Sequence, residues 1–452
     1  MARRRRKKLP TEVIQATITS LSHEGKGICH IDDKTVFVDG ALEGETVRFS
    51  YTGKRKNIME AVVEEVITAS DLRVEPGCEF FAICGGCSLQ HMQAEEQIHR
   101  KQQVLLDNLL HIGKCKPKEI LNPLTGPHWG YRRKARLGVR YVEKKEKLLV
   151  GFREKRSNFL AQIESCKVLH PAIGYRLTDL AKLIRGLSIY TKIPQIEVAI
   201  GDEQGTLIIR HLEPLSAKDK EQLIAFAIKS DLQMFLQPAG PDSIERLYPA
   251  SNQACSPLNY YLPEFNIKHE FRATDFTQVN MVINRKMVDL ALDLLQPQKT
   301  DQVLDLFCGL GNFTLPLARM AAKVVGVEGS DDLVAQAKKN AQYNNIENVE
   351  FYSADLFKDN NQQAWAKQKY HRILLDPARS GAKEIVEYLP KFGAHTVVYV
   401  SCNPATLARD AEILVHQHGY TMEKAGVMDM FPHTAHVESI ALFTNKSKNN
   451  AS

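Results

Sequence analysis

A regular alternation of strand-like and helical segments begins near residue 276 and continues toward the C-terminal end of the chain. The strand-like segments are short apolar runs, each followed by a polar loop, at residues 303–306, 324–327, 349–352, 373–375 and 398–400. Alternation of this kind is typical of an α/β fold with a doubly wound parallel sheet covered by helices. Such sheets bind ligands beyond the carboxyl ends of their strands. The chemistry of this chain is therefore expected in the loops that follow the runs.

The loop after the first run favours a nucleotide-like ligand. Gly309 and Gly311 allow a ligand to approach the backbone closely, but Thr314 stands where a dinucleotide-binding loop has its third glycine. An acid follows each of the next three runs, namely Glu328, Asp355 and Asp376. One such acid alone could be a helix cap. Three in register favour a ligand with ribose, adenine and a charged amino-acid portion, which describes S-adenosyl-L-methionine.

Cys402 lies directly after the fifth apolar run, and a helical pattern follows Pro404. A helix that begins here offers backbone amides and the positive end of its dipole, so we expect a thiolate to be favoured over a thiol. The alternative is a buried structural cysteine. Cys402 is therefore a candidate nucleophile.

Basic residues near the N-terminus and in the middle of the chain favour nucleic acid as a partner. Residues 3–8 contribute six basic side chains, which equals the formal net charge of +6. Such a tail is typical of an arm that binds nucleic acid, the alternative being a solvated end. A second basic cluster at residues 131–156 includes Tyr131 and Phe152, which could stack on bases.

The composition favours a cytoplasmic protein. No apolar run is long enough to span a bilayer, and the basic start lacks the apolar segment of a signal peptide. Nine cysteines, an odd number, suit a reducing compartment better than a disulfide scaffold.

The segment from residue 11 to about 70 shows five short alternating runs separated by glycine-containing turns, which predicts a small antiparallel barrel of the oligonucleotide-binding type. Its turns at residues 23–27 and 40–45 resemble those of the TRAM domain. We therefore expect a basic tail (1–10), a β-barrel (11–70), a central α+β domain (71–275) and a Rossmann-like catalytic domain (276–452).

Cys78, Cys84 and Cys87 predict a metal centre in the central domain. Their spacing can place three sulfurs around one point, and the intervening glycines expose amides to sulfur. A closed site needs a fourth ligand, for which Cys115 and Cys166 are candidates. Zinc and a [4Fe-4S] cluster both fit these ligands, and three unrelated buried cysteines are the alternative.

The motifs together resemble the RNA uracil-5-methyltransferase family, most closely its bacterial iron–sulfur members that act on 23S ribosomal RNA, over nearly the whole chain. The matching segments are residues 276–280, 305–313, 401–404 and 436–438, with the three acids named above. The resemblance implies that S-adenosyl-L-methionine is bound by Gln278, Phe307, Asn312, Glu328, Asp355 and Asp376. It implies that Cys78, Cys84, Cys87 and Cys166 hold a [4Fe-4S] cluster, which leaves Cys115 out. It also implies Cys402 as nucleophile and Glu438 as base, and a monomer without an obligate protein partner.

The residue types suit this reaction. A thiolate that adds to uracil C6 makes C5 nucleophilic toward a methyl sulfonium, and a base must then remove the C5 proton. His433 and His436 are rival bases on sequence alone. Three alternatives stay open: a non-catalytic RNA-binding ribosome-assembly factor, an enzyme acting on transfer RNA, and an amino-group methyltransferase. The last is disfavoured because Ala378 and Arg379 follow Asp376-Pro377, where such sites usually have an aromatic residue.

Overall fold

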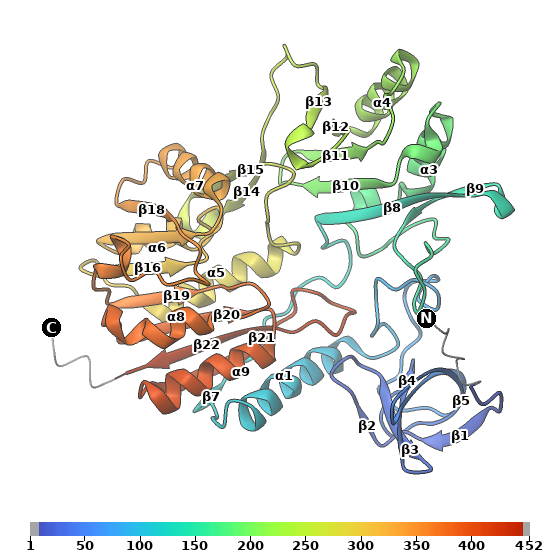
Figure 1. Cartoon of the computed structure of the whole chain (residues 1–452), viewed down its shortest axis with the longest axis horizontal. Helices are drawn as coiled ribbons and strands as arrows, with labels where there is room; N and C mark the ends of the chain where they lie inside the picture. Colours follow the sequence, from blue (N-terminus) through green and yellow to red (C-terminus); the bar gives the residue numbers. More distant parts are fainter. Residues whose placement is uncertain (1–8, 446–452) are drawn as a thin grey trace, which may run out of the picture.

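The strands form four sheets in the computed structural model, which describes residues 9–445 (Figure 1). Residues 1–8 of the predicted basic tail lie outside the described part. Among the described residues, no helix has both the length and the apolar character needed to cross a lipid bilayer.

The N-terminal sheet has six strands rather than the five expected, in the order β1-β5-β6-β4-β3-β2. Its strands are β1 (Ile14–Thr17), β2 (Ser20–Leu21), β3 (Gly27–Ile31), β4 (Lys34–Asp39), β5 (Thr46–Arg55) and β6 (Ile58–Thr68). The prediction of a wholly antiparallel barrel was wrong, because β4 pairs with β6 in parallel. Alternate residues, among them Val36, Val38 and Phe49, are fully buried inside the sheet, as the period of two predicts.

The central sheet is mixed, with the order β13-β12-β11-β10-β8-β9. Its strands are β8 (Lys134–Val142), β9 (Lys147–Gly151), β10 (Gln195–Ile200), β11 (Gly205–Arg210), β12 (Gln233–Gln237) and β13 (Glu245–Tyr248). Its helices are α2 (Pro171–Gly174), α3 (Leu177–Gly186) and α4 (Ala217–Ser230). A separate hairpin of β14 (Leu258–Leu262) and β15 (Ile267–Phe271) packs its apolar side into the core of the C-terminal part.

The C-terminal sheet has eight strands in the order β18-β17-β16-β19-β20-β22-β21-β7. Its strands are β7 (Glu119–Ile120), β16 (Gln302–Leu306), β17 (Lys323–Glu328), β18 (Val349–Ser353), β19 (Arg372–Leu375), β20 (Thr396–Ser401), β21 (Thr421–Met428) and β22 (Glu438–Thr444). The helices that follow or precede these strands are α5 (Met281–Leu295), α6 (Thr314–Met320), α7 (Asp331–Tyr343), α8 (Lys383–Tyr388) and α9 (Pro404–Glu412). The predicted doubly wound parallel sheet is confirmed for β16 to β20. Strand order reverses between β16 and β19, which is where such sheets bind ligands.

Short 3₁₀ turns and one π-turn complete the described elements. They are Glu143–Lys145, Tyr190–Lys192, Pro241–Ser243, Pro263–Phe265, Trp365–Lys367 and Leu389–Phe392, with the π-turn at Ile413–Gln417.

Helix α1 (Ala94–His111) lies beside α9 and along the C-terminal sheet, far in sequence from either (Figure 1). Its apolar residues Ile98, Leu105 and Leu109 are buried in the same core as β19 and β20. The helix begins at Ala94 after Gln93, whose side chain makes no capping hydrogen bond. In the segment before it, the Ser88 hydroxyl accepts a hydrogen bond from the amide of Ala435 (3.2 Å). The predicted domain boundaries stay a prediction, and α1 ties the segment after the cysteine motif to the catalytic sheet.

Candidate active site

The glycine loop after β16 turns its backbone toward open space. Phe307, Gly309 and Gly311 have positive φ angles of 64°, 54° and 89°. A Cβ placed on Gly309 would meet no atom within 4 Å, so a ligand could approach the backbone here. The hydroxyl of Thr314 donates to the buried Asp305 carboxylate (2.5 Å). Because Asp305 precedes the loop and Thr314 follows it, this hydrogen bond joins the two ends of the loop. Thr314 therefore has a structural use at the position where a dinucleotide loop has glycine.

The three predicted acids lie around this loop. Glu328 accepts hydrogen bonds from the amides of Gly309 (3.1 Å) and Gly329 (2.8 Å), so one carboxylate braces two loops. Asp355 follows β18, and its neighbour Phe357 packs against the ring of Phe307 at 5.8 Å between centroids. Burial raises the pKa of Asp376, which follows β19, to about 7. The structure thus gathers the acids at the carboxyl ends of adjacent parallel strands.

The other two predicted cofactor residues differ in how their side chains are used. Gln278 is half-buried on the segment between β15 and α5. The Asn312 carboxamide is hydrogen-bonded within the protein. Its oxygen accepts from the Tyr260 hydroxyl (3.0 Å) and the Asn284 side-chain amide (3.1 Å), and its nitrogen donates to the Asn284 side-chain oxygen (3.0 Å). Asn312 therefore holds the loop against α5 and β14, and its backbone is the part left for a ligand.

Cys402 and Glu438 meet at the edge where β20 ends and β22 begins. Ser401 pairs with Ser439 in antiparallel register, so the next position of each strand faces the other. The Ser439 hydroxyl also donates to the Ser401 carbonyl (3.2 Å). The thiol and the carboxyl group, 36 positions apart in sequence, are thus placed side by side by strand register.

The electrostatics around the thiol correct one expectation. Burial, and then the Glu438 and Asp376 carboxylates, raise the pKa of Cys402 to about 11, while Arg379 opposes the shift. The expected preference for the thiolate was therefore wrong, because burial and the neighbouring carboxylates outweigh any stabilisation from the N-terminus of α9. That N-terminus is capped by Asn403, whose side chain accepts from the Ala405 amide (3.1 Å). Without substrate the group is a thiol, and it must lose its proton as it reacts.

Glu438 has the properties of a group that exchanges protons near neutrality. It is 7% exposed, and burial together with the Asp376 carboxylate raises its pKa to about 8. Lys101 and Arg379 act in the opposite direction. A carboxyl group with a pKa near the working pH is suited to general base and acid catalysis.

The rival bases are placed differently. The His433 ring is buried against Trp129 (4.2 Å between centroids), its Nδ1 pairs with Gln97, and burial lowers its pKa to about 4. His436 is exposed in a groove of about 290 Å³. The groove is lined by parts of the N-terminal sheet, the cysteine loop and the catalytic region, namely His23, Glu24, Gly85, Gly86, Cys87, Ser88, Arg379, Thr434, Ala435 and His436.

Lys101 and Arg379 were missed by sequence reasoning as residues of the site. Lys101 pairs with Asp429, 328 positions away, so no local pattern could reveal it. The one available signal for Arg379 was its place three residues after Asp376, in a loop that follows a strand.

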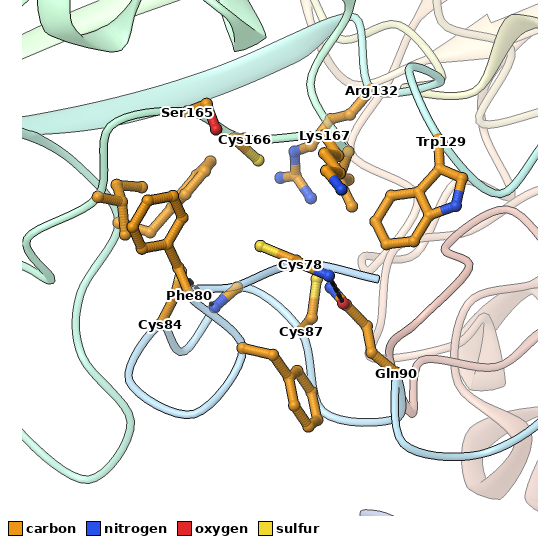
Figure 2. Close-up of a pocket in the computed structure, with 15 residues that line it drawn as sticks. Cys78, Phe80, Cys84, Cys87, Gln90, Trp129, Arg132, Ser165, Cys166 and Lys167 are labelled. Carbon is orange, nitrogen blue, oxygen red and sulfur yellow. Dashed lines mark hydrogen bonds between the residues drawn. The ribbon is translucent and has the colours of Figure 1, made fainter. Parts of the chain in front are cut away.

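The predicted metal ligands share one cavity of about 160 Å³. Figure 2 shows Cys78, Cys87 and Cys166 directing their sulfurs into this space, with Cys84 at its edge. The Gly86 amide donates to the Cys84 sulfur (3.4 Å), as expected from the glycine pair. In the part of the chain that the structure describes, no three candidate ligands already converge on a point. Cys115 lies instead in the core beneath α1, apart from the four lining cysteines.

This chain is similar to known proteins over nearly its whole length. The family "tRNA (Uracil-5-)-methyltransferase" matches residues 261–446, and the TRAM domain matches residues 7–48. The 23S rRNA (uracil(1939)-C(5))-methyltransferase RlmD of Hahella chejuensis is 54% identical over 445 residues, covering 97% of this chain and 99% of that protein. The RlmD protein of Methylococcus capsulatus is 52% identical, covering 98% and 99%.

A solved structure supports the fold. The Pyrococcus abyssi tRNA (uracil-54, C5)-methyltransferase, in complex with S-adenosyl-L-homocysteine, superposes with a TM-score of 0.73 at 21% identity, covering 95% of this chain and 100% of that one. The fold is thus that of an S-adenosylmethionine-dependent methyltransferase with an N-terminal TRAM domain. Since the identity to the curated relatives extends over nearly the full length of both chains, this chain belongs to the RlmD family of RNA uracil-C5-methyltransferases.

Proposed function

We propose that this enzyme methylates C5 of a uridine in 23S ribosomal RNA, with Cys402 as nucleophile and Glu438 as base. The observation that carries the proposal is the placement of the two side chains opposite each other where β20 and β22 meet, beside Asp376. The names of the full-length relatives favour ribosomal over transfer RNA as substrate, and favour an enzyme over a non-catalytic assembly factor.

The residues perform the reaction in two stages. The Cys402 thiol releases its proton to solvent as Sγ bonds to uracil C6, and the electron pair of the C5–C6 double bond moves into an enolate that makes C5 nucleophilic. C5 then attacks the methyl group, whose bond to the donor sulfur breaks with the electron pair left on that sulfur. Glu438 removes the C5 proton, the C6–S bond breaks, and the cysteine is released for another turnover.

The methyl donor would lie in the crevice between β16 and β19. When bound, S-adenosyl-L-methionine supplies an electrophilic methyl group. We propose that it is held by Gln278, Phe307, Asn312, Glu328, Asp355 and Asp376. The open backbone at Gly309 and the acids gathered around it support this assignment.

We also propose that Cys78, Cys84, Cys87 and Cys166 hold a [4Fe-4S] cluster. Cysteines are the only side chains among the cavity lining that commonly ligate metals, and an all-sulfur donor set suits iron–sulfur clusters and zinc. When bound, the group would cross-link the 78–87 loop to the segment around Cys166. The family resemblance favours the cluster over zinc.

RNA binding is assigned to the exposed part of the basic cluster. Several of its cations are engaged within the protein, for example Arg133 with Asp202 and Arg156 with Asp39. The exposed cations of the β8–β9 hairpin include Arg140, Lys144, Lys145 and Lys147. We propose that these contact phosphates, and that the enzyme acts as a cytoplasmic monomer.

A trapping experiment tests the proposal. A ribosomal RNA fragment with 5-fluorouridine at the target position should form a stable covalent complex, because fluorine cannot leave as a proton. Glu438→Gln should accumulate the methylated adduct on unmodified RNA, seen as a protein–RNA band carrying labelled methyl. Normal turnover by Glu438→Gln would remove it from the role of base. Absence of any adduct with the wild-type enzyme would argue against the covalent route.

A further inference from the structure

The connection between β21 and β22, residues 429–437, ends at Glu438 and is held by α1. Lys101 of α1 donates to the Asp429 carboxylate (2.7 Å) and to the Phe431 carbonyl (2.9 Å). Asp429 directly follows Met428, the cross-strand partner of Glu438. Lys101 therefore binds the residue next to the one that faces Glu438 across the sheet.

Further contacts hold the middle of the same connection. The Gln97 carboxamide, one helical turn before Lys101, accepts from the His433 amide (2.9 Å). The His433 carbonyl accepts from the amides of Ser88 (2.9 Å) and Leu89 (3.0 Å). Hydrogen bonds from α1 and from the segment that follows the cysteine motif thus both hold the 429–437 connection in place.

Lys101 is an unusual residue to find here, because a lysine is rarely fully buried. Lys101 and Asp429 are each only 2% exposed. Placing two charges out of water costs free energy that can exceed their mutual attraction, so a buried pair of this kind is weak evidence for a role in stability. A packed apolar side chain could hold α1 against the sheet at lower cost, which suggests that the charge itself has a use.

The Lys101 charge also favours the ionised form of the proposed base. The groups whose charges act on Glu438 are Asp376, Lys101, Arg379 and the Cys402 thiol. Asp376 disfavours the carboxylate form of Glu438, while Lys101 and Arg379 favour it. Arg379 is exposed, so solvent and salt screen it. Lys101 is the buried cation of this set.

We propose that Lys101 is a positioning residue for Glu438: it fixes the 429–437 connection against α1 and supplies the buried positive charge that keeps the carboxylate available for proton removal. The proposal rests on the assignment of Glu438 as the base. It assigns to α1, a helix distant in sequence from the catalytic motifs, a part in the second stage of the reaction.

The test uses Lys101→Met, which keeps the length and apolar stem of the side chain but removes its charge. The pKa of Glu438, already raised to about 8, should then rise further. The base acts in its ionised form. The acidic limb of the pH–rate profile for adduct breakdown should therefore shift to higher pH, by about one pH unit. Breakdown at pH 7 should slow about tenfold, since the ionised fraction falls tenfold for each unit. Formation of the methylated adduct should change much less.

Matched variants separate charge from packing. Lys101→Met/Asp429→Asn removes both buried charges, so it leaves no unpaired carboxylate and keeps the test usable if the single variant folds poorly. Its acidic limb should also move upward. Gln97→Leu loosens the 429–437 connection without changing charge and should leave the limb in place. An unshifted limb in the folded double variant, or an equal shift in Gln97→Leu, would overturn the proposal.

Glu438→Gln distinguishes this failure from failure of the proposed mechanism. If Glu438→Gln blocks adduct breakdown while the lysine variants keep the wild-type limb, only the role of Lys101 is lost. If Glu438→Gln turns over normally, the base assignment fails first, and the role of Lys101 fails with it.

Discussion

Cys402 and Glu438 face each other because Ser401 of β20 pairs with Ser439 of β22 in antiparallel register. A slip of that register by one residue would turn the Glu438 side chain to the other face of the sheet. The position of the proposed base relative to the proposed nucleophile is therefore set by backbone pairing, and the hydrogen bond from the Ser439 hydroxyl to the Ser401 carbonyl reinforces it.

Replacing the nucleophile should abolish methylation. Cys402→Ala should lower methyl incorporation into ribosomal RNA by at least about 10³-fold, because the addition to C6 is lost. Cys255→Ser is the matched control, since Cys255 is a free cysteine in the loop before β14. The measurement is transfer of labelled methyl from S-adenosyl-L-methionine. Full activity in Cys402→Ala would contradict the mechanism.

Glu438 should make the folded protein less stable at alkaline pH. Its pKa is about 8 in the folded protein and near 4.5 when exposed, so the folded state binds the proton more tightly. Stability should fall as pH rises between these values, by on the order of 4 kcal/mol from this group. Glu438→Gln removes this dependence on pH. The free energy of unfolding of the variant, relative to that of the wild type, should therefore increase from pH 5 to pH 9.

Urea unfolding at the two pH values measures this difference. Glu347→Gln, which changes an exposed glutamate, should show no such pH-dependent gain. A constant difference between Glu438→Gln and wild type across the range would show that the carboxyl group is not perturbed by burial.

The four lining cysteines should bind iron and sulfide, whereas Cys115 should not contribute. Protein purified without oxygen should contain iron and acid-labile sulfide in equal amounts, and Cys87→Ser should lose both. Cys115→Ser should retain them, because Cys115 lies in the core beneath α1. Zinc without labile sulfide in the wild-type protein would identify a zinc site instead.

Neutralising the β8–β9 hairpin should weaken RNA binding through charge alone. Lys144→Gln/Lys145→Gln should reduce the slope of log affinity against log salt by about one per lost phosphate contact. Lys338→Gln/Lys339→Gln, an exposed pair on α7, is matched in charge and should leave the slope unchanged. Equal slopes for all three proteins would exclude the hairpin from the RNA contact.

Local patterns were sufficient for much of the fold. The alternation after residue 276 predicted β16 to β20 as parallel strands, and the glycines of the 309–311 loop predicted its open backbone. These features depend on residues close together in sequence, where side-chain period and backbone preference act directly. The same reasoning failed at Cys402, because burial and the Glu438 and Asp376 carboxylates, which come from other segments of the chain, raise the pKa of the thiol.

The sequence alone was enough to identify the doubly wound sheet, the open glycine loop after β16, the cysteine at the end of β20 and the motif of Cys78, Cys84 and Cys87, because each depends on residues close together in the chain. Long-range packing settled the rest. In the folded chain, Cys166 lies in the cavity with the three cysteines of the motif, whereas Cys115 lies in another core. Glu438, and not His433, lies beside the Cys402 thiol. Lys101 forms an ion pair with Asp429. Each of these outcomes depends on burial and on pairing between segments far apart in the chain, and no periodic pattern within one segment carries that information.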